Sequence, residues 1–218
     1  TQFTETSAIF GNDLATFPDF PAEIRAPQGT VPGVSGFQVQ IGQTEVLTAG
    51  DAPDVLVCMN PASLKANLGF LEKGKTLIID DEGFSRPHAL KKAQWDANPL
   101  EDGTLDDFNV ILAPITNLTR TALKDSGIDN KSIIRCKNMF ALGVVYYIFN
   151  RPLNHTEEYL TSKFSKKPDL ANANILALRS GFNYADTIEA ISSTFKIAPA
   201  TLAKGTYWNI MGNQATAW

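Results

Sequence analysis

The chain has 218 residues, of which 44% are hydrophobic and 19% are charged, and this suits one compact domain, with or without a helical appendage. The formal net charge of -4 argues against a general binder of nucleic acid or of anionic membranes. No apolar run approaches the ~20 residues that a membrane-spanning helix needs.

Cysteine is scarce: Cys58 and Cys136 are the only two, and the sequence contains no Cys-x-x-Cys motif. This chain should therefore hold no iron–sulfur cluster or zinc ribbon of its own. Cys58 lies in the apolar run VLVCMN, where a buried, unreactive thiol is expected. The low cysteine content fits a reducing cytoplasm, which is the location we expect.

The most irregular stretch is FPDFPAEIRAPQGTVPGVSGFQVQIG, residues 17–42. Its prolines fix backbone angles, and three glycines permit close approaches that a side chain would block. These glycines are Gly29, Gly33 and Gly36. We expect a rigid loop that presents one acid and one base, Glu23 and Arg25, as binding loops do. A plain connection with a solvated Glu and Arg fits the same pattern. Alternation over residues 37–41 predicts a half-buried strand.

The next elements follow one another directly, as in a parallel α/β unit. A continuous apolar run over residues 55–59 predicts a central strand, buried on both faces. Asn60 is suited to cap a helix over residues 61–68, and Pro61 to occupy its first position.

A second buried strand is predicted over residues 76–80, and three carboxylates, Asp80, Asp81 and Glu82, stand at its end. Carboxylates at the carboxyl edge of a strand can bind a metal or act as a general base. A solvated turn is the alternative. Residues 83–107 are rich in charges and turn residues, which predicts an excursion over the surface.

A third strand is predicted over residues 110–115, followed by a helix that Thr116 or Asn117 caps and that ends near Gly127. Ile133 and Ile134 fit a short strand.

The C-terminal third is predicted to be helical. The expected helices cover residues 139–149, which are apolar nearly all round, then 156–164, capped by Thr156, and 169–181, ending at Gly181. Asn213 is suited to cap a last helix that the chain end cuts short, which indicates a piece of a longer protein. We therefore expect an α/β fold: a three-layer, Rossmann-like open sheet, mostly parallel, with a helical C-terminal third.

Six segments together resemble the gamma-type domain of the 2-oxoacid:ferredoxin oxidoreductases, and they occur in the family's order. They are FPDFPAEIRAP (17–27), VPGVSGFQVQIG (31–42), DVLVCMNPASLKANL (54–68), TLIIDD (76–81), KNMFALGVVYYIFNRPL (137–153) and GTYWNIMGNQATAW (205–218). The PAEIR turn and the style of ending are most similar to the fused gamma–alpha subunit of the 2-oxoglutarate branch.

Two departures limit what is carried over. The family usually opens with a Gly-rich strand–turn–helix, and this chain begins after the place where that would lie. Trp208 stands where the family usually has an arginine, which removes one positive charge for an anionic ligand.

The resemblance implies an enzyme that interconverts a 2-oxoacid and coenzyme A with acyl-CoA, CO2 and reduced ferredoxin. Thiamine diphosphate, Mg2+ and 4Fe-4S clusters would be held mainly outside this chain, by a thiamine- and cluster-binding subunit. A dimer of heterodimers is the implied assembly. The gamma-type domain would cover residues 17–204, after an incomplete or flexible segment 1–16, and residues 205–218 would lead to a following domain.

In such an enzyme this domain would complete the active site and contact coenzyme A. Arg25 is the expected contact for an anionic group, because guanidinium pairs with carboxylate or phosphate at two points. Glu23 would orient it, while the loop glycines would expose backbone NH groups. Four asparagines are further candidates, although a helix cap is the alternative role for each: Asn60, Asn138, Asn209 and Asn213.

Two other functions stay open. One is a non-catalytic assembly domain that docks partner subunits through the helix over residues 139–149 and the terminal segment. The other is an unrelated nucleotide-binding α/β protein, which the missing phosphate loop disfavours.

Overall fold

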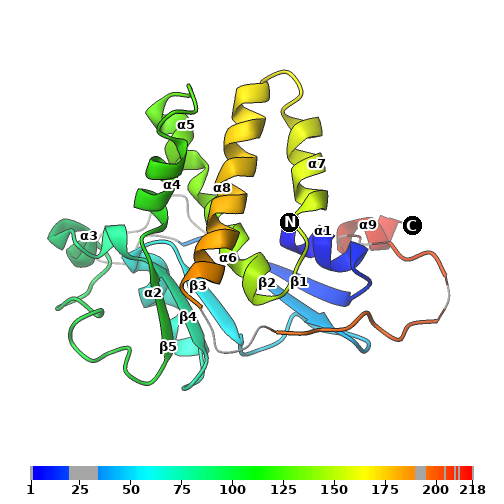
Figure 1. The fold of residues 1–218 in the computed structure, drawn as a ribbon. Coiled ribbons are helices and arrows are strands. Elements are labelled where there is room, and N and C mark those ends of the chain that lie inside the picture. The colour runs from blue at the N-terminus through cyan, green and yellow to red at the C-terminus, as the bar shows by residue number, and fades with distance from the viewer. Residues whose placement is uncertain are drawn as a thin grey trace.

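The computed structural model describes residues 2–19, 34–189, 195–203, 205–208, 210 and 212–217. Within these ranges the chain forms a mixed α/β fold (Figure 1). The elements are α1 (Gln2–Ile9), β1 (Asp13–Asp19), β2 (Gly36–Gly42), β3 (Val55–Cys58), α2 (Pro61–Asn67), η1 (Leu68–Phe70), β4 (Thr76–Asp80), η2 (Asp81–Gly83), α3 (Pro87–Lys92), β5 (Asn109–Ala113), α4 (Ile115–Leu123), α5 (Asn130–Arg135), α6 (Lys137–Ile148), α7 (Asn154–Lys163), α8 (Pro168–Thr187) and α9 (Gly212–Ala217).

Three parallel strands form the main sheet in the order β3-β4-β5. Val57 lies opposite Ile78, and Ile78 lies opposite Ile111. β4 is the middle strand and is buried along its whole length. The expectation that residues 55–59 form the central strand is wrong, because β3 lies at an edge of the described sheet. An apolar run indicates that both faces of a strand are covered, but it does not indicate where the strand lies in the sheet.

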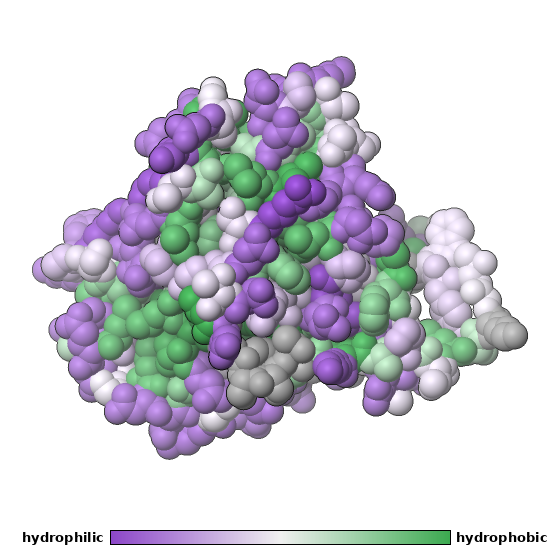
Figure 2. All heavy atoms as spheres, in the orientation of Figure 1, coloured by the Kyte–Doolittle hydropathy of each residue, from purple (hydrophilic) through white to green (hydrophobic). Residues whose placement is uncertain are grey.

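Helices cover both faces of this sheet. Ile78 packs into one apolar cluster, with Phe140 and Val144 of α6. Its neighbours Leu77 and Ile79 point the other way, toward Leu64 of α2. This alternation gives the layered arrangement of an α/β domain, and the predicted α/β fold with a parallel sheet and a helical C-terminal region is confirmed. In Figure 2 hydrophobic residues gather over the sheet region, whereas the tips of the upright helices are mostly hydrophilic.

The longest helices, α6 and α8, pack backbone against backbone. A Cβ atom placed on Gly181 would lie 1.9 Å from the carbonyl oxygen of Phe140, and one on Gly143 would lie 2.0 Å from that of Leu178. Gly181 was expected to end its helix, and that expectation is wrong, because α8 continues to Thr187. Gly181 allows α6 and α8 to pack closely, and it does not end α8.

Three local predictions in the C-terminal half are corrected. Residues 133 and 134 belong to helix α5, whose first turn is capped by the side chain of Asp129. Thr116 and Asn117 lie inside α4, which begins directly after Pro114. Thr156 lies inside α7 and is buried, where its hydroxyl is 2.7 Å from the hydroxyl of Tyr146. In each case a tertiary contact or a cap elsewhere overrides the local signal.

The predicted strand over residues 37–41 is confirmed as β2, which pairs antiparallel with β1. Residues 2–9, which gave no periodic signal, form α1. This helix buries Thr4, Thr6 and Ser7 instead of large apolar side chains. The extended C-terminal segment crosses the base of the β1–β2 hairpin, where the NH of Ala200 donates to the carbonyl of Gly11 at 2.8 Å.

None of the helices in the described ranges has the length and hydrophobicity that crossing a membrane requires.

Candidate functional site

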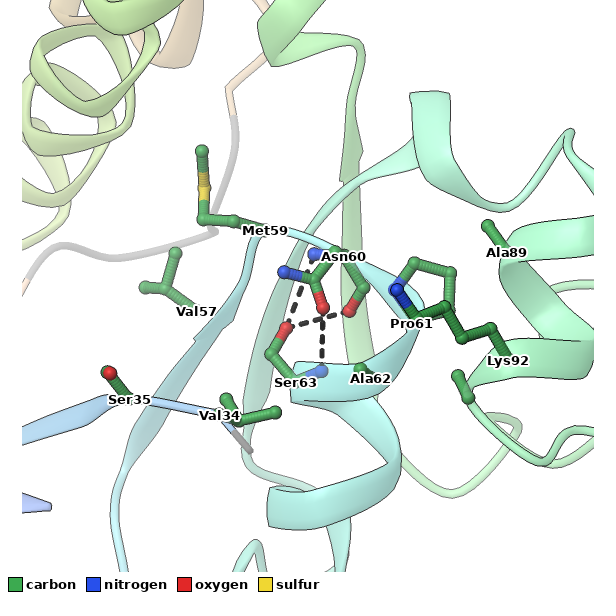
Figure 3. Close-up of a pocket in the computed structure, with 11 residues that line it drawn as sticks. Val34, Ser35, Val57, Met59, Asn60, Pro61, Ala62, Ser63, Ala89 and Lys92 are labelled. Carbon is green, nitrogen blue, oxygen red and sulfur yellow. Dashed lines mark hydrogen bonds between the residues drawn. The ribbon is translucent and has the colours of Figure 1, made fainter. Parts of the chain in front are cut away.

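A pocket of about 430 Å³ opens at the carboxyl end of β3. Its walls come from the end of β3, the beginning of α2, one side of α3 and the two residues before β2 (Figure 3). Most of the lining is apolar, with Val34, Val57 and Met59 on one side. Four polar side chains stand among them: Ser35, Asn60, Ser63 and Lys92. The volume falls in the range of small-molecule sites, and open parallel sheets place ligands at this end of their strands.

Asn60 is held rigidly at the start of α2 by a capping box. The NH of Ser63 donates to Asn60 Oδ1 at 2.8 Å, and the Ser63 hydroxyl accepts from the Asn60 NH at 3.2 Å. Pro61 occupies the first helical position, as the sequence predicted. The amide nitrogen of Asn60 faces the space between Met59 and Val34 in Figure 3. Asn60 is therefore both a helix cap and part of the pocket.

The position of α3 is fixed by Trp95, which follows it. The indole NH of Trp95 donates to the carbonyl of Pro61 at 3.0 Å, and Ala93 is buried beside it. On the other flank, a Cβ on Gly83 would lie 2.8 Å from the Pro61 ring. The indole bond ties the end of α3 to the start of α2, and Gly83 of η2 packs against the same proline. The side chain of Lys92 extends toward Pro61 (Figure 3).

The carboxylate of Asp80, at the end of β4, stabilises the fold by accepting hydrogen bonds from the start of α4. Its side chain is buried and accepts from the NH of Thr116 at 3.2 Å and from the hydroxyl of Thr116 at 2.5 Å. The Lys137 ammonium lies 3.5 Å away. Pro114 provides no side-chain cap for α4, so Asp80 supplies the acceptor for its first turn from another element.

The next two carboxylates differ in electrostatics. Burial, then the charge of Asp80, raise the pKa of Asp81. Burial alone would raise the pKa of Glu82, but the interactions with Arg120, the hydrogen bond from Thr116 and the charge of Arg86 together outweigh burial and lower the pKa. Glu82 Oε1 accepts from Arg120 at 3.1 Å and also from Arg86. In the described ranges no group of three or more His, Cys, Asp or Glu is suited to hold a metal.

Neither cysteine is suited to ligate or react. Cys58 and Cys136 are both buried, in separate apolar clusters. Burial raises the pKa of Cys58 to about 12 and that of Cys136 to about 11, so both stay protonated thiols. A 4Fe-4S cluster takes four thiolates, and the whole sequence has only two cysteines. The residues of this chain alone do not fit that cofactor.

The candidate residues from the sequence fall into three groups. Five lie outside the described residues: Glu23, Arg25, Gly29, Gly33 and Asn209. Asn60 and the start of β2 meet at the pocket, where Gly36 directly follows the lining residue Ser35. Asn138 is exposed at the start of α6 and Asn213 is exposed in α9, and neither lines this pocket.

Sequence reasoning missed Lys92, because residues 83–107 were interpreted as a surface excursion. The available sequence signal was the apolar pair Ala93 and Trp95 within that charged stretch, and in the structure Ala93 is buried and Trp95 half-buried.

Comparison with known proteins places these features in a family. The family model described as pyruvate ferredoxin/flavodoxin oxidoreductase matches residues 1–184. The 2-oxoglutarate oxidoreductase subunit KorA of Mycobacterium tuberculosis is 50% identical over 217 residues. That match covers 100% of this chain and 33% of the relative, so the chain spans about a third of the relative's length. The chain belongs to the pyruvate ferredoxin/flavodoxin oxidoreductase family, and the resemblance inferred from its six segments is confirmed.

Two solved structures share the fold. One is titled 2-oxoglutarate:ferredoxin oxidoreductase from Magnetococcus marinus with 2-oxoglutarate, coenzyme A and succinyl-CoA bound. It has a TM-score of 0.64 and 24% identity, over 91% of this chain and 30% of that chain. The other is the gamma subunit of a keto/oxoacid ferredoxin oxidoreductase from Geobacter sulfurreducens PCA, with a TM-score of 0.52 and 16% identity, over 85% of this chain and 88% of that chain.

Proposed function

We propose that this chain is the gamma-type part of a 2-oxoacid:ferredoxin oxidoreductase that acts on 2-oxoglutarate. The reaction joins the acyl group of the 2-oxoacid to coenzyme A, releases CO2 and passes the electron pair to ferredoxin. The observation that carries the proposal is the 50% identity to the KorA subunit along the whole of this chain. The exposed pocket at the carboxyl end of β3 supports it, because a domain that completes an active site needs such a surface.

In this proposal the redox cofactors are bound elsewhere in the enzyme. Thiamine diphosphate with Mg2+ supplies the carbon chemistry, and 4Fe-4S clusters carry the electrons. The donor set of this chain does not fit a cluster. We therefore assign both cofactors to a thiamine- and cluster-binding subunit, with ferredoxin as the acceptor, a dimer of heterodimers as the assembly and the cytoplasm as the location.

Within the chain, the pocket is the proposed contact for coenzyme A or the 2-oxoacid, with Asn60 as one hydrogen-bond donor. The segment carrying Glu23 and Arg25 stays a proposed second contact for an anionic group. We keep residues 17–204 as the gamma-type domain and residues 205–218 as the segment that leads to a neighbouring domain. The other proposed contacts to ligands or neighbouring domains are Gly29, Gly33, Gly36, Asn138, Asn209 and Asn213.

The test uses the enzyme complex that contains this chain. Purified complex should reduce ferredoxin only when 2-oxoglutarate and coenzyme A are both present. Replacing Arg25 by Ala should abolish acyl-CoA formation while assembly stays intact, whereas the exposed Arg135→Ala serves as the matched control. A colourless monomer that turns over NADH would overturn the proposal. Unchanged kinetics in Arg25→Ala would remove only the role of that residue.

The alternative function, an assembly domain, rested on two expected docking surfaces, and the structure leaves one of them exposed. The helix over residues 139–149 was its expected docking surface, but α6 buries Phe140, Val144 and Ile148 within this chain's own core. The terminal segment does present exposed aromatic rings, with Tyr207 61% and Trp208 68% exposed. Loss of subunit association after Trp208→Ser, with unchanged binding of coenzyme A, would favour a purely architectural role for that segment.

A further inference from the structure

We propose that Lys92 recognises the anionic end of the molecule that enters the pocket at the carboxyl end of β3. This inference rests on the proposed function, because it names what that same site recognises. The ligand class is an elongated organic anion, with a carboxylate or phosphate at one end and a carbonyl or amide oxygen along its body.

The chemistry of the lining defines this class. The amide nitrogen of Asn60 and the ammonium of Lys92 are both hydrogen-bond donors, and they stand at different points of the wall (Figure 3). Apolar side chains, among them Val34, Val57 and Met59, fill much of the remaining lining. A matching molecule places an acceptor beside Asn60, an apolar stretch along the wall and a negative charge beside Lys92.

The charge of Lys92 is available for such a ligand. In the described part of the chain, none of the salt bridges engages Lys92 or its neighbour Lys91. The nearby Lys65 places its ammonium 4.3 Å from the ring centre of Trp95, which adds positive charge on the same side of the domain. An unneutralised ammonium at the mouth of an apolar pocket attracts anions and orients them.

The scaffold also holds Lys92 in place. Trp95 binds the carbonyl of Pro61, Ala93 is buried, and Gly83 lies directly against the Pro61 ring. Because α3 is tied to the start of α2 in this way, the backbone that carries Lys92 and the Asn60 amide keep a fixed relation. A binding pair on a rigid scaffold gives specificity at little entropic cost.

The experiment compares three variants of the intact enzyme complex. Lys92→Met removes the charge and keeps the stem, Lys92→Arg restores a charge, and Lys91→Met removes the adjacent charge, which does not line the pocket. Each is assayed with four ligands: coenzyme A, dephospho-coenzyme A, 2-oxoglutarate and 2-oxobutyrate. The last two differ by the distal carboxylate, and the first two by one phosphate.

We expect Lys92→Met to raise the KM of one anionic ligand about tenfold, the effect of one charge-assisted hydrogen bond. kcat and the melting temperature should stay unchanged. Lys92→Arg should recover most of the affinity, and Lys91→Met should behave as wild type. If the anion is a phosphate, Lys92→Met loses the preference for coenzyme A over dephospho-coenzyme A. If it is a carboxylate, the variant loses the preference for 2-oxoglutarate over 2-oxobutyrate.

Two further readouts separate this inference from the proposed function. The KM of the affected ligand should rise with ionic strength in wild type and much less in Lys92→Met, which a merely structural role would not produce. Calorimetric binding of coenzyme A and of 2-oxoglutarate tests Lys92 even in a complex without turnover. Wild-type constants in Lys92→Met for all four ligands would overturn the inference and leave the proposed function standing. An intact complex that reduces no ferredoxin with 2-oxoglutarate would overturn the proposed function instead.

Discussion

The two helical layers that cover the sheet are built differently. On one face, α6 and α8 touch through their backbones at Gly143 and Gly181, around a continuous apolar cluster. On the other face, a capping box fixes the start of the short helix α2, one indole hydrogen bond ties it to the end of α3, and a pocket stays open beside them. The backbone contact leaves no room for a ligand between α6 and α8, whereas the α2–α3 side leaves room and holds a few polar groups still.

This contrast indicates that one side of the domain stabilises the fold and the other side is open to ligands. The α6–α8 side carries the stability, because dense packing of apolar atoms is the main stabilising term in a core. The α2–α3 side is packed less densely, and a ligand can therefore enter the pocket there. Substitutions on the two sides should therefore separate into effects on unfolding and effects on ligand binding.

The largest expected effect is that of Gly181→Ala. The added methyl group would meet the backbone oxygen of Phe140 at 1.9 Å, and backbone atoms cannot move aside as a side-chain tip can. The helices must separate, which should lower the free energy of unfolding by about 3 kcal/mol. Thermal and urea unfolding measure this. Gly69→Ala is the matched control, because nothing lies within 4 Å of a Cβ there. A wild-type melting temperature in Gly181→Ala would refute the backbone contact.

Asp80→Ala should come next, with a loss of about 2 kcal/mol. The substitution leaves the NH and hydroxyl of Thr116 without their acceptor and removes the partner of Lys137. Chemical unfolding of the variant checks the size of the loss. The exposed Asp125→Ala, with a side chain 87% accessible, should change stability little. Equal losses in the two variants would contradict the capping role that we assign to Asp80.

The sequence predicted those parts of the fold whose signal is local. Apolar runs identified β4 and β5, and the Asn60-Pro61 pair identified the start of α2, because a cap and its helix are neighbours in the chain. Strand order was not predictable, since β3 is as apolar as a central strand yet lies at an edge of the sheet that the described residues form. α1 was missed because it buries threonine and serine, which carry no hydrophobic periodicity.

The residues of the candidate site were also predictable only where the signal is local in the sequence. Asn60 was predicted as a site residue from its place at the end of a strand, and the structure brings it to a pocket. Lys92 was not predicted, because its position depends on a hydrogen bond between Trp95 and Pro61, 34 residues apart in the sequence. Similarly, a glycine that ends a helix and a glycine that admits another helix look alike until the partner is known, as Gly181 demonstrates.

Asn60 offers a prediction that divides its two roles. Asn60→Ala should cost about 1 kcal/mol of stability through the lost cap and should also weaken ligand binding. Asn60→Asp keeps an acceptor for the Ser63 NH and so keeps the cap, but it replaces the amide donor with a negative charge. We expect wild-type stability with raised KM in Asn60→Asp. Ser63→Ala, which removes the hydroxyl from the capping box and leaves the Asn60 amide in place, should lower stability. Wild-type binding in Asn60→Asp would confine Asn60 to the cap.

The smallest effect concerns the salt bridge between Glu157 of α7 and Arg179 of α8, whose facing atoms lie 2.6 Å apart. Arg179 is 58% exposed, so solvent screening limits this pair to about 0.5 kcal/mol. The hydrogen bond from Arg179, opposed by burial, lowers the pKa of Glu157 below its usual 4.5.

For a carboxylate with a lowered pKa, the stabilisation is fully present above the usual value and is lost as the pH falls through the lowered one. The stability difference between wild type and Arg179→Met should therefore be present at neutral pH and shrink as the pH falls below 4.5. High salt should shrink it as well, because the pair is open to solvent. A difference that persists in acid would mean that Arg179 acts through the packing of its stem. Packing would then contribute to stability at the outer surface of α8 as well as at its contact with α6.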